Sequence, residues 1–487
     1  MTQRDWFTRS TESGRAQLAD WAGSLPDEQF NEKTTRMAML LAEQFPDRRS
    51  RIGLWGENSL DYLVALFAVM RAGHVAVPLQ TRLTARELTE IVRFADLQGL
   101  LVSRSFPQTH RETMPGLPIL TFGMKLETPP SRPPRFKELG DKDVAVLLCT
   151  SGSSGKAKVV PFTLRALLDH GKVVCEHLKV TWKDSWLVCL PFYHIGGLAI
   201  PFRCLVSGAS LCISQSADPD EINRLIDRED ATVITLVPTV LERVLIKREG
   251  QEFPKSLRAI IVGGGPVPAG LLARCPVAYA TYGLTETGSM VTCARPGCGD
   301  RERKTAGPVL PGTQIKILND SGKEVKKVEA GQIVARGPGM AHLYLGNPDA
   351  SAKTFRSGWI YTGDIGKLDE NGYLIVEARR QDLVLTGGEN VYPAEIEEAL
   401  RKHPRVESVV VLPVEDPEWG QTPAALIVLK PGRPLQKIHI FQFLEDHLAR
   451  FKFPRKVVFT EKLPTLSNGK PDMPAIRKLL TSAPDSK

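Results

Sequence analysis

The sequence predicts an α/β protein, with a large multi-layer N-terminal domain of mixed or parallel sheets and a small α+β C-terminal domain. Two observations lead to this fold class: short apolar strands alternate with helical segments over most of the chain, and the pattern changes after about Arg380. A chain of 487 residues has room for about three folding units of roughly 150 residues each. We therefore expect a large domain over residues 1–380 and a small one over residues 381–487.

The first elements alternate in the order strand, helix, strand. Arg51–Trp55 is a short run typical of a buried strand, Tyr62–Arg71 has apolar residues at helical spacing, and Val75–Leu79 is a second strand. Prolines then accumulate between residues 107 and 136, which indicates a connector on the surface. This alternation favours parallel strands joined by helices.

The alternation resumes with apolar runs that end in glycine-rich segments. Val144–Leu148 is a predicted strand, small polar residues and glycines follow it, and a helix is predicted after Pro161. Thr232–Val237 and Ala259–Val262 have the composition of interior strands, and the second ends directly at three glycines. Because α/β sheets bind ligands at the carboxyl ends of their strands, both glycine-rich segments are candidate binding loops.

The last part of the chain has a pattern of its own. A helix is predicted from Pro393, because proline fits the first turn and the glutamates that follow it suit the positive end of the helix dipole. Strands over Ser408–Val414 and Ala424–Leu429 and a helix over Ile438–Phe451 come next. These elements are sufficient for a small separate domain.

Composition and charge exclude several classes of protein. The excess of 63 Lys and Arg over 55 Asp and Glu is small for this length and forms no block, which argues against dedicated nucleic-acid binding. The longest run without these residues, Ser185–Phe202, contains prolines and paired glycines and does not fit a membrane span. The N-terminal residues are charged where a secretory signal would be apolar, and the 8 cysteines include no CxxC pair. We expect a cytoplasmic protein with free thiols.

The strongest local motif is TSGSSGKAK, Thr150–Lys158, which follows a predicted strand. Its glycines let the backbone approach an anion, its hydroxyl groups add donors and its lysines supply charge, so it is a candidate loop for polyphosphate. It differs from a Walker A loop in the spacing of its glycines and in the alanine after Lys156. The residues expected at the phosphates are Thr150, Ser151, Gly152, Ser153, Ser154, Gly155 and Lys156.

This motif resembles the phosphate loop of the adenylate-forming superfamily, which includes acyl-CoA synthetases, firefly luciferase and the adenylation domains of peptide synthetases. Five further motifs of that superfamily follow in order: GGGP, TYGLTET, YTGD, ARRQDLVLTGGENVYPAEIE and SNGK, at residues 263–266, 281–287, 361–364, 378–397 and 467–470. Six motifs in the right order are not a coincidence. The resemblance implies the adenylate-forming enzyme fold and an AMP-forming acyl-CoA synthetase that depends on ATP, Mg²⁺ and coenzyme A.

The resemblance also implies which residues bind the nucleotide. The segment along adenine consists of Gly263, Gly264, Gly265 and Pro266. Tyr282, followed by Gly283, would stack on adenine, while the Asp364 carboxylate and the planar Arg379 guanidinium suit the ribose hydroxyls.

The chemistry explains the remaining site residues that the resemblance implies. Because a carboxylate is a poor electrophile, it first attacks the α-phosphate of ATP, and a thiol then opens the resulting acyl-adenylate. Thr285 would donate to the α-phosphate, and Glu286 would be the metal ligand. Lys470 would bring a point charge to the acyl carboxylate and the α-phosphate, and Gln381 would be the hinge about which the small domain rotates.

The chain departs from the common pattern of the superfamily at four positions. Ala157 and Val159 replace a proline and a glycine of the phosphate loop, which changes its stiffness more than its charge. Ala378 stands where glycine usually precedes the arginine, and Gln381 stands where the hinge residue is usually Asp or Lys.

The segment LPFYHIGGLAIPFRCL, Leu190–Leu205, carries the expected substrate specificity. His194 resembles the pocket residue beside the acyl carboxylate, and Arg203 follows nine residues later in an apolar run, where an unpaired arginine is costly to bury. Ligases that activate o-succinylbenzoate in menaquinone biosynthesis typically show an arginine at this spacing. The resemblance to this subgroup implies that Arg203 binds the second carboxylate of the substrate; the alternative is a helix cap or a solvent-facing side chain.

The expected partners are therefore a small-molecule carboxylic acid, ATP and coenzyme A, with no nucleic acid and no membrane span, and a homo-oligomer is left open. A second hypothesis is another aryl- or acyl-CoA synthetase. A third is a catalytically silent acyl- or nucleotide-binding regulator, against which the intact Glu286, Asp364, Arg379 and Lys470 argue. A module that loads a carrier protein is a further alternative, although no carrier domain is part of this chain.

Overall fold

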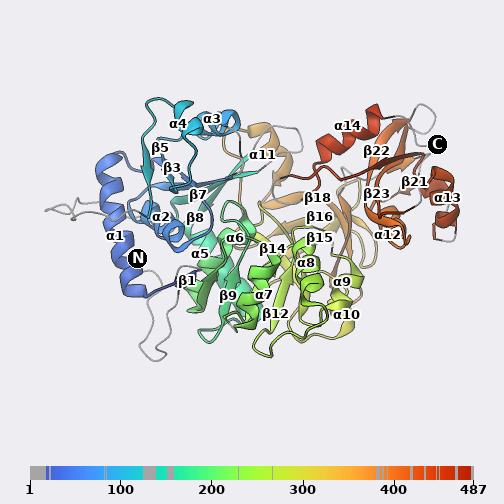
Figure 1. The fold of residues 1–487 in the computed structure, drawn as a ribbon, viewed down its shortest axis with the longest axis horizontal. Coiled ribbons are helices and arrows are strands. Elements are labelled where there is room, and N and C mark those ends of the chain that lie inside the picture. The colour runs from blue at the N-terminus through green and yellow to red at the C-terminus, as the bar shows by residue number, and fades with distance from the viewer. Residues whose placement is uncertain are drawn as a thin grey trace. The chain divides into compact units, whose positions relative to one another are not determined.

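The computed structural model describes residues 18–20, 23–81, 83, 85–123, 139–150, 158–228, 230–265, 267–379, 384–386, 389–391, 393–416, 420–432, 435–445, 447–448, 450–466 and 470–483. The chain forms two compact units (Figure 1). The first contains Met1–Lys316, Val334–Thr362 and Asn371–Leu374, and the second contains Ile317–Ile333, Gly363–Glu370 and Ile375–Lys487. The expected domain boundary at residues 380 and 381 lies outside the described residues and stays a prediction.

An eight-stranded sheet in the first unit has the strand order β14-β13-β12-β11-β9-β10-β1-β2. Its strands are β1 (Leu18–Asp20), β2 (Gly23–Leu25), β9 (Ser185–Val188), β10 (Ser210–Ile213), β11 (Val233–Leu236), β12 (Ala259–Val262), β13 (Ala278–Leu284) and β14 (Ser289–Cys293). The strands from β13 to β1 pair in parallel, and β14 and β2 are antiparallel edges. The two interior strands predicted for this region are β11 and β12, which confirms them.

A six-stranded sheet in the same unit has the order β6-β5-β3-β4-β7-β8. Its strands are β3 (Arg51–Trp55), β4 (Val75–Leu79), β5 (Gly99–Val102), β6 (Ile119–Thr121), β7 (Val144–Thr150) and β8 (Lys158–Thr163). The predicted strands β3, β4 and β7 are confirmed, but β8 lies between the glycine-rich segment and the helix expected directly after it. Proline usually marks the end of a strand, but Pro161 is tolerated because β8 is an antiparallel edge strand of the sheet.

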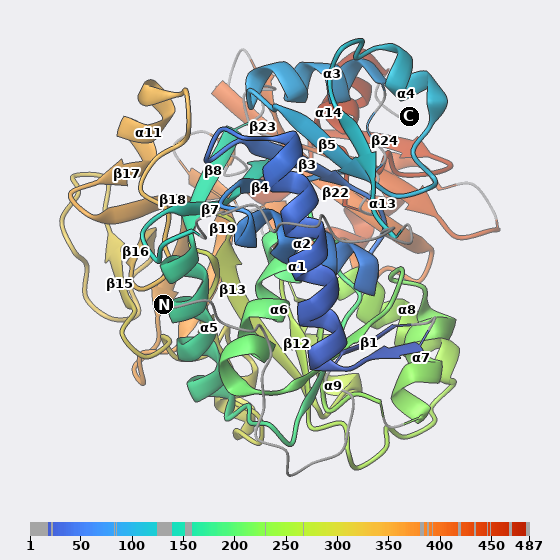
Figure 2. The same cartoon turned by 90° about the vertical axis from the view of Figure 1, so that its left-hand side faces the viewer.

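The first unit also contains helices, most of which pack against these two sheets. They are α1 (Asp27–Gln44), α2 (Leu60–Arg71), α3 (Ala85–Phe94), α4 (Gln108–Glu112), α5 (Leu164–Leu178), α6 (Ile195–Ser207), α7 (Pro219–Asp227), α8 (Pro238–Arg248), α9 (Ala269–Arg274), α10 (Asp300–Arg303) and α11 (Pro348–Thr354). Helix α1 lies against α2, as Figure 2 shows. Helix α2 begins at the N-cap Ser59, whose hydroxyl accepts a hydrogen bond from the Tyr62 amide.

Side chains alternate between the two faces of each sheet and so belong to different apolar clusters. In β12, Ile261 faces a central cluster that also holds α1, α2, α5 and α6, while Ile260 faces a second cluster with α7, α8 and α9. In β3, Leu54 joins the central cluster and Trp55 a third one, which includes residues of α3. The first unit is therefore layered, with helices between its two sheets and on the outer face of each.

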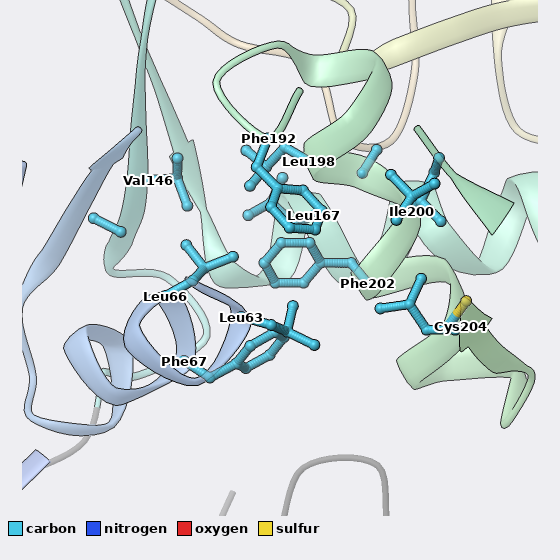
Figure 3. Close-up of a cluster of buried hydrophobic side chains, with 14 of the residues drawn as sticks. Leu63, Leu66, Phe67, Val146, Leu167, Phe192, Leu198, Ile200, Phe202 and Cys204 are labelled. Atoms are coloured by element: carbon cyan, nitrogen blue, oxygen red, sulfur yellow. The ribbon is translucent and has the colours of Figure 1, made fainter. Parts of the chain in front are cut away.

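The central cluster is built around aromatic and branched side chains of α2 and α6. Phe202 of α6 is fully buried and lies with its ring centroid 5.6 Å from that of Phe67 in α2. Figure 3 shows Leu63 and Leu66 of α2 on the same side of Phe202, and Leu167 of α5 on the other. These contacts fix α6, which carries the expected substrate residues, between the two sheets.

The remaining strands form two smaller sheets. One has the order β15-β16-β18-β17 with β19 beside β18, and the other, in the second unit, has the order β21-β20-β23-β22 with β24 beside β23. The strands are β15 (Gln314–Leu318), β16 (Gly331–Arg336), β17 (Phe355–Arg356), β18 (Trp359–Leu368), β19 (Leu374–Arg379), β20 (Val384–Thr386), β21 (Glu389–Val391), β22 (Val406–Asp416), β23 (Gly420–Leu429) and β24 (Lys456–Thr460).

The second unit also contains helices α12 (Pro393–Arg401), α13 (Lys437–Glu445) and α14 (Met473–Ser482), and a 3₁₀ helix over Arg450–Lys452. The helix predicted from Pro393 and the two strands after it are confirmed. The helix expected over Ile438–Phe451 ends earlier, at Glu445, and the short 3₁₀ helix follows it. Among the described residues, none of the helices combines the length and apolar character needed to cross a membrane.

Candidate functional site

The glycine-rich segment that is expected to bind phosphate lies in the chain between two antiparallel strands of the six-stranded sheet. Strand β7 ends at Thr150, which is paired with Lys158 at the start of β8. Ser151, Gly152, Ser153, Ser154, Gly155 and Lys156 lie outside the described residues, as do Ala157 and the side chain of Thr150. Because β7 runs parallel to β4, the loop starts at the carboxyl end of a parallel strand, where ligands of α/β sheets bind.

The second glycine-rich segment follows β12 at the carboxyl end of the eight-stranded sheet. A Cβ atom on Gly263 would lie 2.5 Å from Cγ2 of Thr281, so only glycine fits against β13 at this position. Gly264 has a φ of +78°, which glycine adopts without strain, and Gly264 and Gly265 are exposed. The exposed backbone of Gly264 and Gly265 is accessible to a ligand, and Pro266 lies outside the described residues.

The turn between β13 and β14 presents Thr285 and Glu286. The Thr287 hydroxyl accepts from the Leu284 amide at 2.9 Å and donates to the Ser289 carbonyl at 2.7 Å, which closes the turn. Thr285 and Glu286 are half-buried and remain accessible. The turn therefore holds these two residues in one conformation without involving their own side chains.

The strands of this hairpin approach each other closely at Gly283 and Ser289. A Cβ atom on Gly283 would lie 1.8 Å from the Ser289 carbonyl oxygen, so the hairpin requires glycine there. Ser289 itself has a φ of +117°, a strained value for a residue with a side chain. Tyr282, expected to stack on adenine, is largely buried in β13.

The Glu286 carboxylate is held by a residue that the sequence reasoning missed. The Tyr344 hydroxyl donates to Oε1 of Glu286 at 2.6 Å, and the Ala341 amide donates to the Glu286 carbonyl at 2.8 Å. Burial and the adjacent carboxylate raise the pKa of Tyr344, so its hydroxyl keeps its proton and remains a donor. No motif marks Tyr344, because its partner is far away in the sequence.

The expected acyl pocket lies at the N-terminus of α6. His194 is the N-cap residue of α6, half-buried, with the Tyr193 ring at a centroid distance of 4.7 Å. The loop before it is fixed by the buried Asn58, which donates to the Leu190 carbonyl at 2.9 Å and accepts from the Phe192 amide at 3.0 Å. Asn58 is a second positioning residue that sequence reasoning missed.

Arg203 is fully buried in α6 and points toward the same hairpin as Glu286. Its Nη2 donates to the Ser289 hydroxyl at 3.0 Å, and its guanidinium lies 5.2 Å from the ring centroid of Trp186. Within the part of the chain that the structure describes, its Nε and Nη1 have no hydrogen-bond partner and no carboxylate pairs with it. Burial lowers the pKa of Arg203 to about 10, so the side chain stays charged at neutral pH. Both alternatives, a helix cap and a solvent-facing side chain, are wrong.

Three further site residues belong to the C-terminal part of the chain. Asp364 is buried in β18 and belongs to the second unit, as does Lys470. Lys470 is exposed, and its carbonyl accepts a hydrogen bond from the Leu466 amide at 2.8 Å. Arg379 ends β19 and its side chain is not described, while Gln381 lies outside the described residues.

Direct contacts join several of these residues in the first unit. Gly263 packs against β13, the strand that carries Tyr282. Arg203 donates a hydrogen bond to the hairpin that carries Glu286, and Glu286 accepts one from Tyr344. The Lys158 ammonium, at the exit of the phosphate loop, lies 4.6 Å from the ring centroid of Tyr344. The contacts link the strand end at Gly263, the turn that presents Glu286, Arg203 of α6 and Lys158 of β8.

The donor set at Glu286 fits a magnesium ion carried by a nucleotide. Mg²⁺ in such sites is bound by one or two carboxylates and by substrate phosphates, not by a cage of protein ligands. No group of three or more His, Cys, Asp or Glu side chains gathers as a metal site among the described residues. Glu286 with the neighbouring Thr285 hydroxyl is therefore the arrangement through which this chain would hold Mg²⁺.

The chain is similar to known proteins over most of its length. Residues 27–345 match the protein family described as AMP-binding enzyme, and residues 395–470 match its C-terminal domain. The chain is 32% identical, over 456 residues and 92% of each chain, to a protein of Geobacillus sp. strain WCH70 named 2-succinylbenzoate–CoA ligase.

Solved structures give the same relationship. The o-succinylbenzoate CoA synthetase of Bacillus subtilis in complex with the acyl-adenylate OSB-AMP has a TM-score of 0.87 and 29% identity, covering 96% of both chains. The same enzyme in complex with ATP and a magnesium ion has a TM-score of 0.86 and 28% identity, covering 95% of this chain and 96% of that one. The expected superfamily and its fold are confirmed.

Proposed function

The chain belongs to the AMP-binding enzyme family, and we propose that it is an ATP-dependent ligase that joins 2-succinylbenzoate to coenzyme A through an acyl-adenylate. The relatives and solved structures reported above support this substrate, because they carry its name and cover nearly the whole chain. The proposal includes ATP, Mg²⁺ and coenzyme A as the other reactants, in an enzyme of the cytoplasm. Its 8 cysteines, all within described residues, are free thiols, which is consistent with a reducing compartment.

The buried guanidinium of Arg203 is the observation that carries the proposal. A buried charge without a charged partner costs several kcal/mol, so Arg203, on the helix that begins at His194, favours a substrate that supplies the opposite charge. 2-Succinylbenzoate has one carboxylate that reacts and a second one on the ring that does not. Because Arg203 has no exposed surface, it would interact with the ring carboxylate through the Ser289 hydroxyl or through a bound water.

The other residues of the site support the first half-reaction. His194 at the start of α6 would orient the reacting carboxylate, and Thr285 would donate to the α-phosphate that it attacks. Mg²⁺, when bound at Glu286, would neutralise phosphate charge. Lys470 of the second unit is proposed to stabilise the charge that develops on the α-phosphate, and Asp364 to bind the ribose.

The experiment compares two acids in a pyrophosphate-release assay, with and without coenzyme A: 2-succinylbenzoate and an analogue that lacks the ring carboxylate. We expect Arg203→Ala to lose about 2–5 kcal/mol of transition-state stabilisation with the diacid, or roughly thirty- to several-thousand-fold in kcat/KM. Activity on the analogue should change little, because the analogue does not use Arg203.

The matched control is Arg71→Ala, which removes another buried arginine, one that joins α2 to Asn31 and Thr35 of α1. A folding defect lowers the activity on both acids alike, and this is what we expect for the control. If the wild-type enzyme has the same kcat/KM for the analogue as for the diacid, the proposed substrate is wrong. The chain would then be another aryl- or acyl-CoA synthetase. Absence of pyrophosphate release with every acid in a broad panel would support the silent regulator instead.

A further inference from the structure

We propose that Tyr344 is a positioning residue for this reaction: its hydroxyl holds the Glu286 carboxylate in the orientation that binds magnesium-bound ATP. The inference rests on the proposed function, because it takes Glu286 as the residue that holds Mg²⁺. Tyr344 lies between β16 and α11, in the segment that follows Ala341, and belongs to the same unit as Glu286.

One short segment holds Glu286 at both its backbone and its side chain. The Ala341 amide donates to the Glu286 carbonyl at 2.8 Å, and the Tyr344 hydroxyl donates to Oε1 at 2.6 Å. Within the described residues, Tyr344 is the one hydrogen-bond partner of this carboxylate, and no lysine or arginine forms an ion pair with it. A neutral donor therefore fixes the direction of the carboxylate, and among the described residues no cationic side chain competes with a metal ion for it.

Tyr344 is itself rigidly placed. It is 4% exposed, and its ring lies with its centroid 5.1 Å from that of Phe355. Its amide donates to the Ser351 hydroxyl at 2.9 Å, and the next amide, of Leu345, donates to the Val159 carbonyl at 2.8 Å. A donor locked in this way holds its partner at little cost in conformational entropy when the ligand binds.

The face of the same ring meets the strand that leaves the phosphate loop. The Lys158 ammonium lies 4.6 Å from the ring centroid, within the range of a cation–π contact. Tyr344 therefore contacts the first residue of β8 with its ring and the metal-ligand candidate with its hydroxyl. This places one side chain against the two protein segments that are expected to meet the phosphates of ATP.

The test measures the equilibrium affinity for ATP by calorimetry, once with Mg²⁺ and once in EDTA, with no acyl substrate present. Tyr344→Phe removes only the hydroxyl and keeps the ring against Phe355 and Lys158. We expect it to weaken binding of magnesium-bound ATP roughly ten-fold, the scale of a hydrogen bond to a charged group, and to leave binding of metal-free ATP unchanged.

Tyr279→Phe is the matched control. Tyr279 is a buried tyrosine of the same unit whose hydroxyl accepts from the Gly297 amide at 2.8 Å. If Tyr344 had a merely structural role, its substitution would weaken the binding of magnesium-bound and metal-free ATP alike, or would lower only the melting temperature, as we expect for this control. Either result overturns the inference.

A double-mutant cycle with Glu286→Gln tests whether Tyr344 acts through the carboxylate. We expect Tyr344→Phe to add no further loss of affinity for magnesium-bound ATP in the Glu286→Gln background, and additive losses overturn the inference. If the wild-type chain binds ATP with no effect of Mg²⁺, the inference and the proposed role of Glu286 both fail. If Mg²⁺ strengthens ATP binding equally in wild type and Tyr344→Phe, the inference alone fails.

Discussion

His170 is a buried histidine that contacts the hairpin of the candidate site. Its Nε2 is hydrogen-bonded to the Met290 carbonyl at 2.9 Å, and it packs directly against Gly339. Burial, and secondly the charge of Arg203, lower the pKa of His170 to about 4, while the hydrogen bond to Met290 acts in the opposite direction. His170 is therefore neutral in the folded protein at neutral pH and anchors the strand that begins at Ser289.

The lowered pKa predicts how stability depends on pH. The unfolded chain binds a proton at His170 below about pH 6.5, and the folded chain does so only near pH 4. The stabilisation is thus complete above pH 6.5 and is lost as the pH falls toward 4, reaching a loss of about 3 kcal/mol there. We expect His170→Gln, whose amide can still donate to the Met290 carbonyl, to show a shallower loss of unfolding free energy over this range.

Chemical denaturation of both proteins at several pH values between 4 and 8 measures this difference. Other histidines with lowered pKa values titrate in both proteins, so only the difference between the two curves reports on His170; they are the buried His74 and His403 and the half-buried His177. Parallel curves would show that His170 makes no contribution of its own.

The site residues found from the sequence differ in kind from those found only in the structure. Glu286, Thr285 and the glycines at 263–265 lie in motifs whose neighbouring residues are expected to share one chemical task, so the local sequence is sufficient to propose them. Tyr344 and Asn58 act through partners 58 and 132 residues away in the chain. No local pattern can show such a pairing, because it exists only once the sheets have assembled.

At the scale of elements, the loop before α6 depends on a contact between the two sheets of the first unit. Asn58 follows β3 of the six-stranded sheet, and the loop that it holds follows β9 of the eight-stranded sheet. Gly197 allows this close approach, because a Cβ atom there would lie 2.3 Å from the Leu190 carbonyl oxygen. The position of His194 at the start of α6 is therefore set by residues outside the helix.

Removing the hydrogen bonds of Asn58 should weaken the binding of the carboxylic acid substrate and leave the binding of ATP unchanged. Asn58→Ala leaves a buried carbonyl and a buried amide without partners, and we expect it to lower the free energy of unfolding by about 2–4 kcal/mol. The KM for the carboxylic acid should rise roughly ten-fold while the KM for ATP stays within about two-fold, because the phosphate segments do not use Asn58.

Asn223→Ala is the control, since Asn223 also joins two elements of the first unit, donating from α7 to the Val244 carbonyl of α8 at 3.2 Å. Steady-state kinetics and denaturation of both variants separate the effects. A rise in both KM values for Asn58→Ala, or a rise in neither, would contradict the positioning of the acyl pocket by Asn58.

The elements themselves were largely predictable, and the exceptions have a physical cause. Interior strands such as β12 are continuous apolar runs that end at glycines, a pattern that does not depend on their neighbours. Strand β8 was missed because Pro161 interrupts a short apolar run, and only its place at the edge of a sheet makes the proline acceptable. Edge positions are a property of the assembled sheet and have no local signal.

At the scale of the whole molecule, the expected machinery is divided between the two units. Thr285, Glu286 and Arg203 belong to the first, and Asp364 and Lys470 belong to the second. The chain passes from one unit to the other several times between Lys316 and Ile375, and no change in composition marks these points.

This division predicts that the two half-reactions can be separated by one substitution in the second unit. If Lys470 acts at the α-phosphate, Lys470→Ala should slow formation of the acyl-adenylate by a factor on the order of 10²–10³ or more, the scale of losing one donor to a developing oxyanion. Formation of the thioester from supplied acyl-adenylate should survive, since the α-phosphate is then already joined to the acyl group. Pyrophosphate release measures the first step and release of AMP from the supplied adenylate the second.

Lys478→Ala, which removes an exposed lysine of α14 in the same unit, controls for a general loss of positive charge. It should leave both steps unchanged. Because a structural defect in the second unit would slow the two half-reactions together, the ratio of the two rates is the decisive quantity. An unchanged ratio in Lys470→Ala, with both rates reduced, would show that Lys470 supports the loop that begins at Leu466 and does not act on the phosphate.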